Sequence, residues 1–232
     1  MKKLMFGLFA GIGISLAVGA AEMDYGLTPQ AVAPDVYAFI GKTEDFDTTN
    51  GGNIVNTGFI VAQDGVIVVD TGPSLRYGRQ MREAITRVTS KPIVMVINTH
   101  HHPDHFLGNQ AFADLPIATL AEIQKGIVTE GNAFAENLFR MSGDWMSGTE
   151  VVAPTQTLVA GTQTIGGRRV RVMALDGHTG ADLALVDETS GVLFAGDLVF
   201  DHRAPTTPHA DVDHWQSSLA ILEATMLKGE VK

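Results

Sequence analysis

The pattern of apolar and polar residues divides the chain into two groups of strands with helices between and after them. In the first half, apolar runs bounded by turn residues predict strands over 31–40, 56–61, 66–69, 93–97 and 117–120. Asp64-Gly65 stands between two of these runs and predicts a hairpin. Helical spacing occurs over 77–88 and 106–112, and 120–146 is expected to be mostly helical although two glycines interrupt it.

The second half of the chain roughly repeats this order. Strands are predicted over 157–159, 162–165, 170–174, 183–186 and 191–195. A closing amphipathic helix is predicted over 213–227, with Trp215, Leu219, Leu222 and Met226 on its apolar side. Because strands cluster and helices alternate with them, we expect an α/β fold of two packed sheets with helices outside.

The first twenty residues have a different character from the rest. Lys2 and Lys3 are followed by an apolar run over 4–17 and by small residues over 18–20, an order typical of a cleaved secretory signal. The alternative is a membrane anchor, but the run is shorter than the about 20 residues that a span requires. We therefore predict a signal peptide over 1–20, one domain over 21–232, a periplasmic location and no stable membrane span after cleavage.

Charge and cysteine content narrow the function further. Removing Lys2 and Lys3 from 16 basic residues leaves 14 against 26 acidic residues, which brings the formal charge to −12. Such a surface repels nucleic acid, so no nucleic-acid partner is expected. The chain has no cysteine, and any metal site must therefore use histidine, carboxylate or water.

Four of the eight histidines lie between positions 100 and 105, in a stretch that matches the pattern H-x-H-x-D-H. His100 and His102 alternate on an extended segment and would point to the same side, and Pro103 keeps His102 extended. The turn that follows presents Asp104 and His105 from another direction, so the stretch could offer two ligands to each of two metal ions. The alternative is a histidine-rich surface turn, which the buried apolar run leading into the motif disfavours.

Three further residues fit the same site. His178 lies in a Gly-His-Thr-Gly turn between two predicted strands and could complete a histidine triad. Asp197 follows an apolar strand and could bridge two metals, whereas Asp70 ends another strand and could either orient a ligand histidine or cap a turn. Taken alone, each would be an ordinary turn residue.

The order of these motifs, from about Asn53 to Leu227, resembles the metallo-β-lactamase superfamily. The resemblance implies an αββα sandwich of two mixed sheets with outer helices and two zinc ions per complete chain. The metal residues that it implies are His100, His102 and His178 for one zinc, Asp104 and His105 for the other, and Asp197 as the bridge. In such enzymes a metal-bound hydroxide attacks an ester, thioester or amide carbonyl of a small-molecule substrate, and Asp104 is the expected catalytic residue that orients it.

Within the superfamily the chain is most similar to exported quinoprotein relay system zinc metallohydrolases, through residues 134–141, 195–200 and 203–206. This resemblance implies a periplasmic quinoprotein as a partner. Two other functions stay open: a β-lactamase, and a non-catalytic metal-binding accessory protein of a periplasmic quinoprotein oxidation system. Histidine and aspartate ligands also suit iron and manganese.

Two departures from the family pattern affect these expectations. Asp197 stands where one β-lactamase subclass has cysteine, and Phe200 stands where that subclass has the lysine that meets the β-lactam carboxylate, so we expect weak β-lactamase activity at most. The family also has a final metal histidine after the closing helix. We expect the chain to be a fragment without the C-terminal strand and helix, with His202, His209 and His214 as the alternative sources of that ligand.

Overall fold

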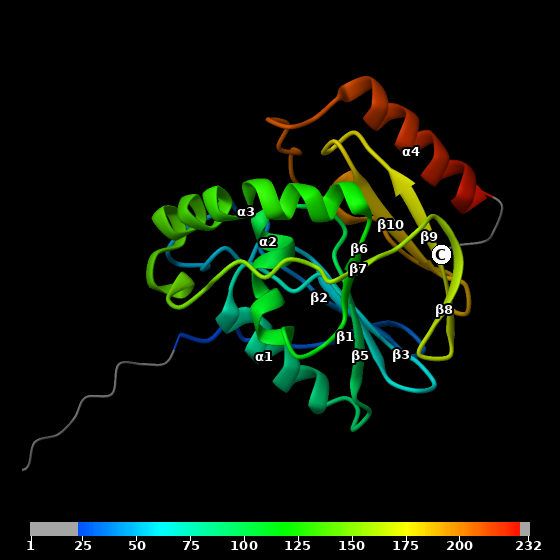
Figure 1. Ribbon diagram of the computed structural model, residues 1–232, viewed down its shortest axis with the longest axis horizontal. Helices are drawn as coiled ribbons and strands as arrows, with labels where there is room; N and C mark the ends of the chain where they lie inside the picture. Colours follow the sequence, from blue (N-terminus) through cyan, green and yellow to red (C-terminus); the bar gives the residue numbers. More distant parts are fainter. Residues whose placement is uncertain (1–22, 228–232) are drawn as a thin grey trace, which may run out of the picture.

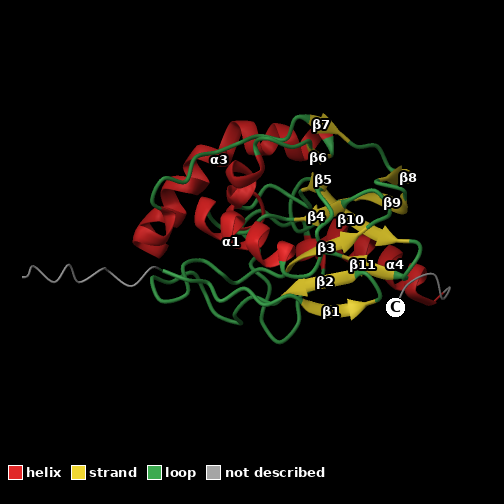
Figure 2. Ribbon diagram, turned by 90° about the horizontal axis from the view of Figure 1, so that it is seen from below, coloured by secondary structure: helices red, strands yellow, loops and turns green. Residues whose placement is uncertain are grey.

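The computed structural model describes residues 23–227, and the predicted signal peptide lies outside them. Two sheets pack face to face, with helices on both outer sides (Figure 1). Figure 2 shows helices α1 (Leu75–Thr86) and α3 (Ala121–Ser142) on one side of the strands and α4 (Val212–Leu227) on the other. The predicted two-sheet α/β sandwich is therefore confirmed.

The first sheet has seven strands, antiparallel from the first to the fourth and parallel from there on. These are β1 (Gln30–Ala33), β2 (Val36–Phe39), β3 (Thr57–Val61), β4 (Val66–Val69), β5 (Ile93–Ile97), β6 (Ile117–Thr119) and β7 (Gln156–Thr157). The hairpin at Asp64-Gly65 joins β3 to β4, as predicted. The prediction of a single strand over 31–40 is wrong. Pro34 and Asp35 turn the chain back between β1 and β2, and Asp35 has a φ of 63°.

The second sheet has four strands, in the order β11-β10-β9-β8. They are β8 (Gly161–Ile165), β9 (Arg168–Leu175), β10 (Asp182–Asp187) and β11 (Val192–Phe194). All its pairs are antiparallel, so the expectation of two mixed sheets holds for the first sheet only. The physical reason is the short connections, because a parallel pair needs a crossover of a dozen or more residues.

Short helical segments complete the fold. They are α2 (Pro103–Phe106) and the 3-10 helices η1 (Leu107–Phe112), η2 (Gly143–Met146) and η3 (Gly196–Leu198). Gly126 within α3 has a packing role, because a Cβ there would lie 2.9 Å from the ring of His101. Among residues 23–227, no helix is both long and apolar enough to cross a bilayer.

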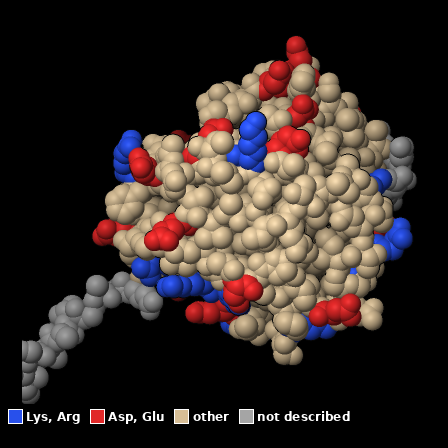
Figure 3. Space-filling view, viewed as in Figure 1, with Lys and Arg blue, Asp and Glu red and all other residues tan. Residues whose placement is uncertain are grey.

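Three apolar layers hold the sandwich together. The central layer joins the facing sides of the two sheets, for example Ile67 of β4 with Leu185 of β10. A second layer packs α1 on the outer face of the first sheet through Met81 and Ile85. A third packs α4 on the second sheet through Trp215. On the face seen in Figure 3, basic and acidic side chains are interspersed around a largely uncharged centre.

The buried side of α4 differs from the predicted one. Trp215 and Leu222 are buried as expected, but Leu219 and Met226 are 41% and 53% exposed. Ser218 lies on the buried side instead, because its hydroxyl donates to the backbone carbonyl of Asp176. A specific polar contact thus accompanies the apolar packing of this helix on the second sheet.

Candidate metal centre

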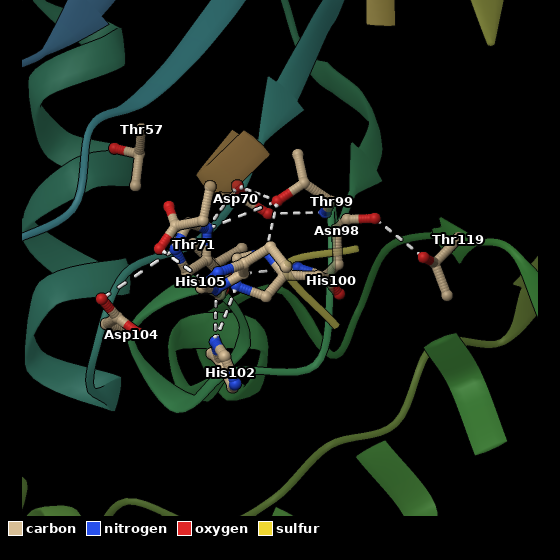
Figure 4. A network of polar contacts seen from close by, with 12 residues as sticks. Thr57, Asp70, Thr71, Asn98, Thr99, His100, His102, Asp104, His105 and Thr119 are labelled. Atoms are coloured by element: carbon tan, nitrogen blue, oxygen red, sulfur yellow. Dashed lines mark hydrogen bonds and ion pairs between the residues drawn. The ribbon is translucent and has the colours of Figure 1, made fainter. Parts of the chain in front are cut away.

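Two parallel strands of the first sheet end together at the candidate site. β5 leads through Asn98 into Thr99, whose backbone N–H and hydroxyl donate to the carboxylate of Asp70 at 2.8 and 2.7 Å. Asp70 follows β4, the parallel neighbour of β5. Figure 4 shows Asp70 and Thr99 on one side of the rings of His100 and His105, and His102 on the other. The strand ends therefore position the motif on a buried polar base.

The local geometry of the motif agrees with its sequence. His102 is extended, with φ −75° and ψ 147°, and Pro103 opens α2 directly after it. His101 is not among the residues whose ligand atoms converge, and its Nε2 faces Glu130 of α3 at 3.9 Å. Asp104 and His105 lie in the short helix and approach the site from a second direction.

Three histidine nitrogens meet in the first group of side chains. His102 Nδ1 lies 3.1 Å from His100 Nε2 and 2.9 Å from His178 Nε2. His178 comes from the turn between β9 and β10, and Asp197 from η3 after β11. The ligand atoms of these four residues all lie within 4.8 Å of one another. Imidazole nitrogens that converge in this way can present their lone pairs to one cation.

A second group lies around His105. Its Nε2 is 3.1 Å from Asp197 Oδ1 and 3.9 Å from Asp104 Oδ2, while its Nδ1 is 2.8 Å from Asp70 Oδ2. This Nε2 is buried. It faces the two carboxylates but forms no hydrogen bond of good geometry with any residue within 23–227. The other oxygen of Asp197 faces His178 Nε2 at 3.5 Å. Asp197 therefore stands between the two groups, with one carboxylate oxygen turned to each.

Electrostatics in the first group favour neutral imidazoles. Burial lowers the pKa of His100 well below its usual value, that of His102 to about 2 and that of His178 to about 4. Burial opposes ionisation of Asp197, but the nearby His105 outweighs it and lowers the pKa of Asp197 to about 2. Neutral imidazoles beside an ionised carboxylate are the donors that a divalent metal ion requires.

In the second group, carboxylates surround a single imidazole. Burial raises the pKa of Asp104 to about 6, although His105 opposes this shift. Burial disfavours protonation of His105, but Asp197, Asp70 and Asp104 raise its pKa well above the usual value. Three carboxylates around one imidazole thus favour a positive charge at this position. The buried Nε2 of His105 and the chemistry of the donor set fit a divalent metal ion.

All six residues predicted as metal ligands are brought together by the fold. Asp70 hydrogen-bonds to His105, which supports its interpretation as an orienting group over that of a turn cap. Sequence reasoning missed Asp182, whose carboxylate accepts hydrogen bonds from the backbone N–H groups of His178 and Thr179 at 3.1 and 2.9 Å. The only signal was a carboxylate four residues after the turn histidine.

The remaining histidines differ in their positions. His202 is 82% exposed and pairs with Asp201, and His214 pairs with Asp176 at the surface. His209 lies against His102, with Nδ1 2.9 Å from Nε2. Among residues 23–227, none of the three forms a hydrogen bond or ion pair within the second group. That the second group takes a further histidine from beyond the closing helix stays a prediction.

The site opens into a cleft of about 1040 Å³. His102, Asp104 and Asp197 line its floor. Its walls include six apolar side chains, Val32, Ile40, Phe46, Ile54, Phe194 and Val199. Three of these, Val32, Ile40 and Val199, are among the exposed large hydrophobic residues of the protein, and a gathering of such residues marks a ligand surface.

Comparisons with known proteins agree with this geometry. Residues 50–231 match the family described as the metallo-beta-lactamase superfamily. The chain is 25% identical over 181 residues to the linear primary-alkylsulfatase of Pseudomonas sp. (strain ATCC 19151), covering 65% of this chain and 34% of the relative. It is 28% identical over 177 residues to the human acyl-coenzyme A thioesterase MBLAC2, covering 65% of this chain and 60% of the relative. The hydroxyacylglutathione hydrolase of Synechococcus sp. (strain JA-3-3Ab) is 32% identical to this chain over 109 residues. The match covers 47% of this chain and 35% of the relative.

The chain thus spans about a third to three fifths of the length of these relatives. Among solved structures, a metallo-beta-lactamase from Pontibacter korlensis superposes with a TM-score of 0.67 at 20% identity, covering 85% of each chain. The metallo-beta-lactamase IND-7 superposes with a TM-score of 0.68 at 18% identity, covering 87% of this chain and 86% of the other. At such identities these structures establish the fold alone.

Proposed function

The chain belongs to the metallo-beta-lactamase superfamily, and on that premise we propose that it is a zinc-dependent hydrolase of ester, thioester or amide bonds in small molecules. The observation that carries the proposal is the position of Asp197. Its two carboxylate oxygens face His105 at 3.1 Å and His178 at 3.5 Å, as a ligand shared by two metal ions requires.

In this proposal, His100, His102 and His178 would hold one zinc, Asp104 and His105 would hold the other, and Asp197 would be shared. Bound zinc would lower the pKa of water to about 7 and polarise a carbonyl group. Asp104 lines the cleft beside His102, which supports a role for its carboxylate in orienting the attacking water. Asp70 keeps the proton of His105 on Nδ1 and thereby leaves Nε2 free as a ligand.

Two observations favour a thioester with an apolar group as the substrate. Two of the similar proteins are named as an acyl-coenzyme A thioesterase and a hydroxyacylglutathione hydrolase. The apolar walls of the cleft, with Ile40 and Val199 exposed toward solvent, would cover an acyl chain. Phe200 lines the cleft where a β-lactamase subclass has lysine, which disfavours the β-lactamase alternative.

The cellular setting is part of the proposal. The signal-like residues 1–20 support export to the periplasm, and residues 134–141, 195–200 and 203–206 support a place among quinoprotein relay system zinc metallohydrolases with a quinoprotein partner. The accessory alternative shares this setting but has no catalytic activity. Fractionation of expressing cells, with the mature N-terminus determined, would contradict export if the chain stayed in the cytoplasm uncleaved.

The test combines zinc content with hydrolysis assays on the wild-type chain, His178→Ala and His214→Ala. His214 is a matched control because it pairs with Asp176 at the surface. We expect the wild type and the control to bind zinc and hydrolyse a chromogenic thioester, and His178→Ala to lose both. Faster turnover of nitrocefin than of the thioester would favour the β-lactamase. Bound zinc without any hydrolysis would favour the accessory protein, and absence of zinc from the wild type would overturn the proposal.

A further inference from the structure

One histidine outside the candidate ligand set lies directly behind a member of that set. His209 Nδ1 is 2.9 Å from His102 Nε2, and the two rings are 5.1 Å apart. This Nε2 is the ring nitrogen that does not face His100 and His178. Phe134 of α3 packs beside both rings, at 5.8 Å from His102 and 5.7 Å from His209.

The contact determines which nitrogen of His102 carries the proton. His102 Nδ1 must keep a free lone pair if it is to bind a metal together with His100 Nε2 and His178 Nε2. The single proton of a neutral imidazole then lies on Nε2, which needs an acceptor. His209 Nδ1 is in the right place to accept it, and His209 in turn carries its own proton on Nε2.

Two other histidines of the site take their partners from the ends of β4 and β5. His105 Nδ1 is paired with Asp70, and His100 Nδ1 lies 3.1 Å from the hydroxyl of Thr99. His102 differs, because its partner comes from the segment 201–211 between η3 and α4. Several residues of this segment also form a wall of the cleft, including Arg203 and Pro208.

The segment is anchored where His209 lies. The backbone N–H of Asp211, two residues further on, donates to the carbonyl of Gly177 at 2.9 Å. Gly177 directly precedes His178, so the anchor also adjoins another candidate ligand. His209 is therefore held between two fixed points, the Gly177 carbonyl and the outer nitrogen of His102.

Resting on the proposed function, we propose that His209 is a positioning residue that fixes the tautomer and ring orientation of His102 for the metal held by the three histidines. It acts through His102 and does not itself face the metal. Because His209 belongs to the cleft wall, it also links the substrate-binding segment to the metal position.

The test compares His209→Ala and His209→Gln with the control His202→Ala, which lies in the same segment and is 82% exposed. Zinc affinity is measured by competition with a chromophoric chelator, and the tautomer of His102 by nitrogen-15 NMR of the zinc-free chain. We expect His209→Ala to weaken the first zinc roughly 10–100-fold and to mix the His102 tautomers. His209→Gln, whose side-chain carbonyl can accept the same hydrogen bond, should retain most of the affinity, and His202→Ala should match the wild type.

Unchanged zinc affinity together with an unchanged His102 tautomer in His209→Ala would overturn this inference alone, while the proposed function stands. A wild-type chain that binds no zinc would overturn the proposed function and this inference with it. If His209→Gln loses zinc as fully as His209→Ala, and the NMR signals of His209 show that zinc binds it directly, His209 is a ligand and the positioning role is wrong.

Discussion

The carboxylate of Asp70 lies 2.8 Å from Nδ1 of His105, and both side chains are almost completely buried. The same carboxylate accepts two hydrogen bonds from Thr99, so it joins the end of β4 to the histidine motif after β5. Asp70 reaches this position at a φ of 58°, in the left-handed region that aspartate tolerates better than most residues. This carboxylate is therefore the structural base on which the motif is assembled.

Replacing Asp70 by asparagine should destabilise the zinc-free protein. The amide would present an NH₂ group to the Thr99 hydroxyl or to His105 Nδ1, where the carboxylate accepts hydrogen bonds. We expect the free energy of unfolding to fall by about 2 kcal/mol, as measured by urea unfolding with chelator present. Asp114→Asn is the control, because its carboxylate is 61% exposed and its pair with Arg82 is at the surface. Equal effects of the two substitutions would contradict the role assigned to Asp70.

Zinc should stabilise the protein through the alternating histidines of the motif. At a zinc concentration 100 times the dissociation constant, the free energy of unfolding should rise by about 2.7 kcal/mol. His100→Ala should abolish this increment because it removes one of the three converging nitrogens. His101→Ala should keep the increment, because His101 is not among the residues whose ligand atoms converge and its Nε2 faces Glu130 at 3.9 Å. Loss of the increment in His101→Ala as well would show that the ligand histidines of the motif have been assigned wrongly.

Gly177 should tolerate no side chain, in contrast to Gly180 in the same turn. A Cβ at Gly177 would lie 2.3 Å from the backbone of Trp215, and its φ of 124° is unfavourable for other residues. We expect Gly177→Ala to cost about 1–3 kcal/mol of stability and to weaken zinc binding by displacing the adjacent His178. Gly180→Ala has nothing within 4 Å of the added Cβ and should behave as wild type in thermal unfolding and zinc titration. Comparable stability of the two variants would argue against the close packing of α4 on this turn.

Acid should destabilise the second sheet through Asp187. Burial opposes its ionisation, but hydrogen bonds from Arg168 and Ser190 lower the pKa of this carboxyl below its ordinary value of 3.8. A group with a depressed folded-state pKa contributes stability above its unfolded pKa and loses it as the pH falls through the folded one. The stability that Asp187 contributes should therefore begin to fall below about pH 4, as measured by the difference between wild type and Asp187→Asn in urea unfolding from pH 7 to pH 3.

Asp187→Asn should remove part of this dependence on pH and cost about 2 kcal/mol at neutral pH, because the partly buried Arg168 loses a charged partner. Glu188→Gln is the matched control on the next residue, since its partner Arg169 is 67% exposed. An unchanged pH profile in Asp187→Asn would assign the acid sensitivity to another group.

The sequence by itself determined the features that depend on residues adjacent along the chain. The apolar runs predicted the positions of β3, β4, β5 and β10, and two of them, β4 and β10, are buried on both faces, where a strand needs no polar alternation. The spacing of His100 and His102, with Pro103 after them, predicted that they share one side. These properties follow from backbone geometry over a few residues, which the local sequence specifies.

Only the tertiary structure decided which polar groups meet. Asp70 and His105 are 35 positions apart, and His102 and His209 are 107 positions apart. The side of α4 that is buried was likewise set by contacts, such as that of Ser218 with Asp176. The ring nitrogen that each histidine offers depends on the partner that the fold brings to its other nitrogen. For His102 and His105 that partner comes from a distant part of the chain, so no local pattern specifies it.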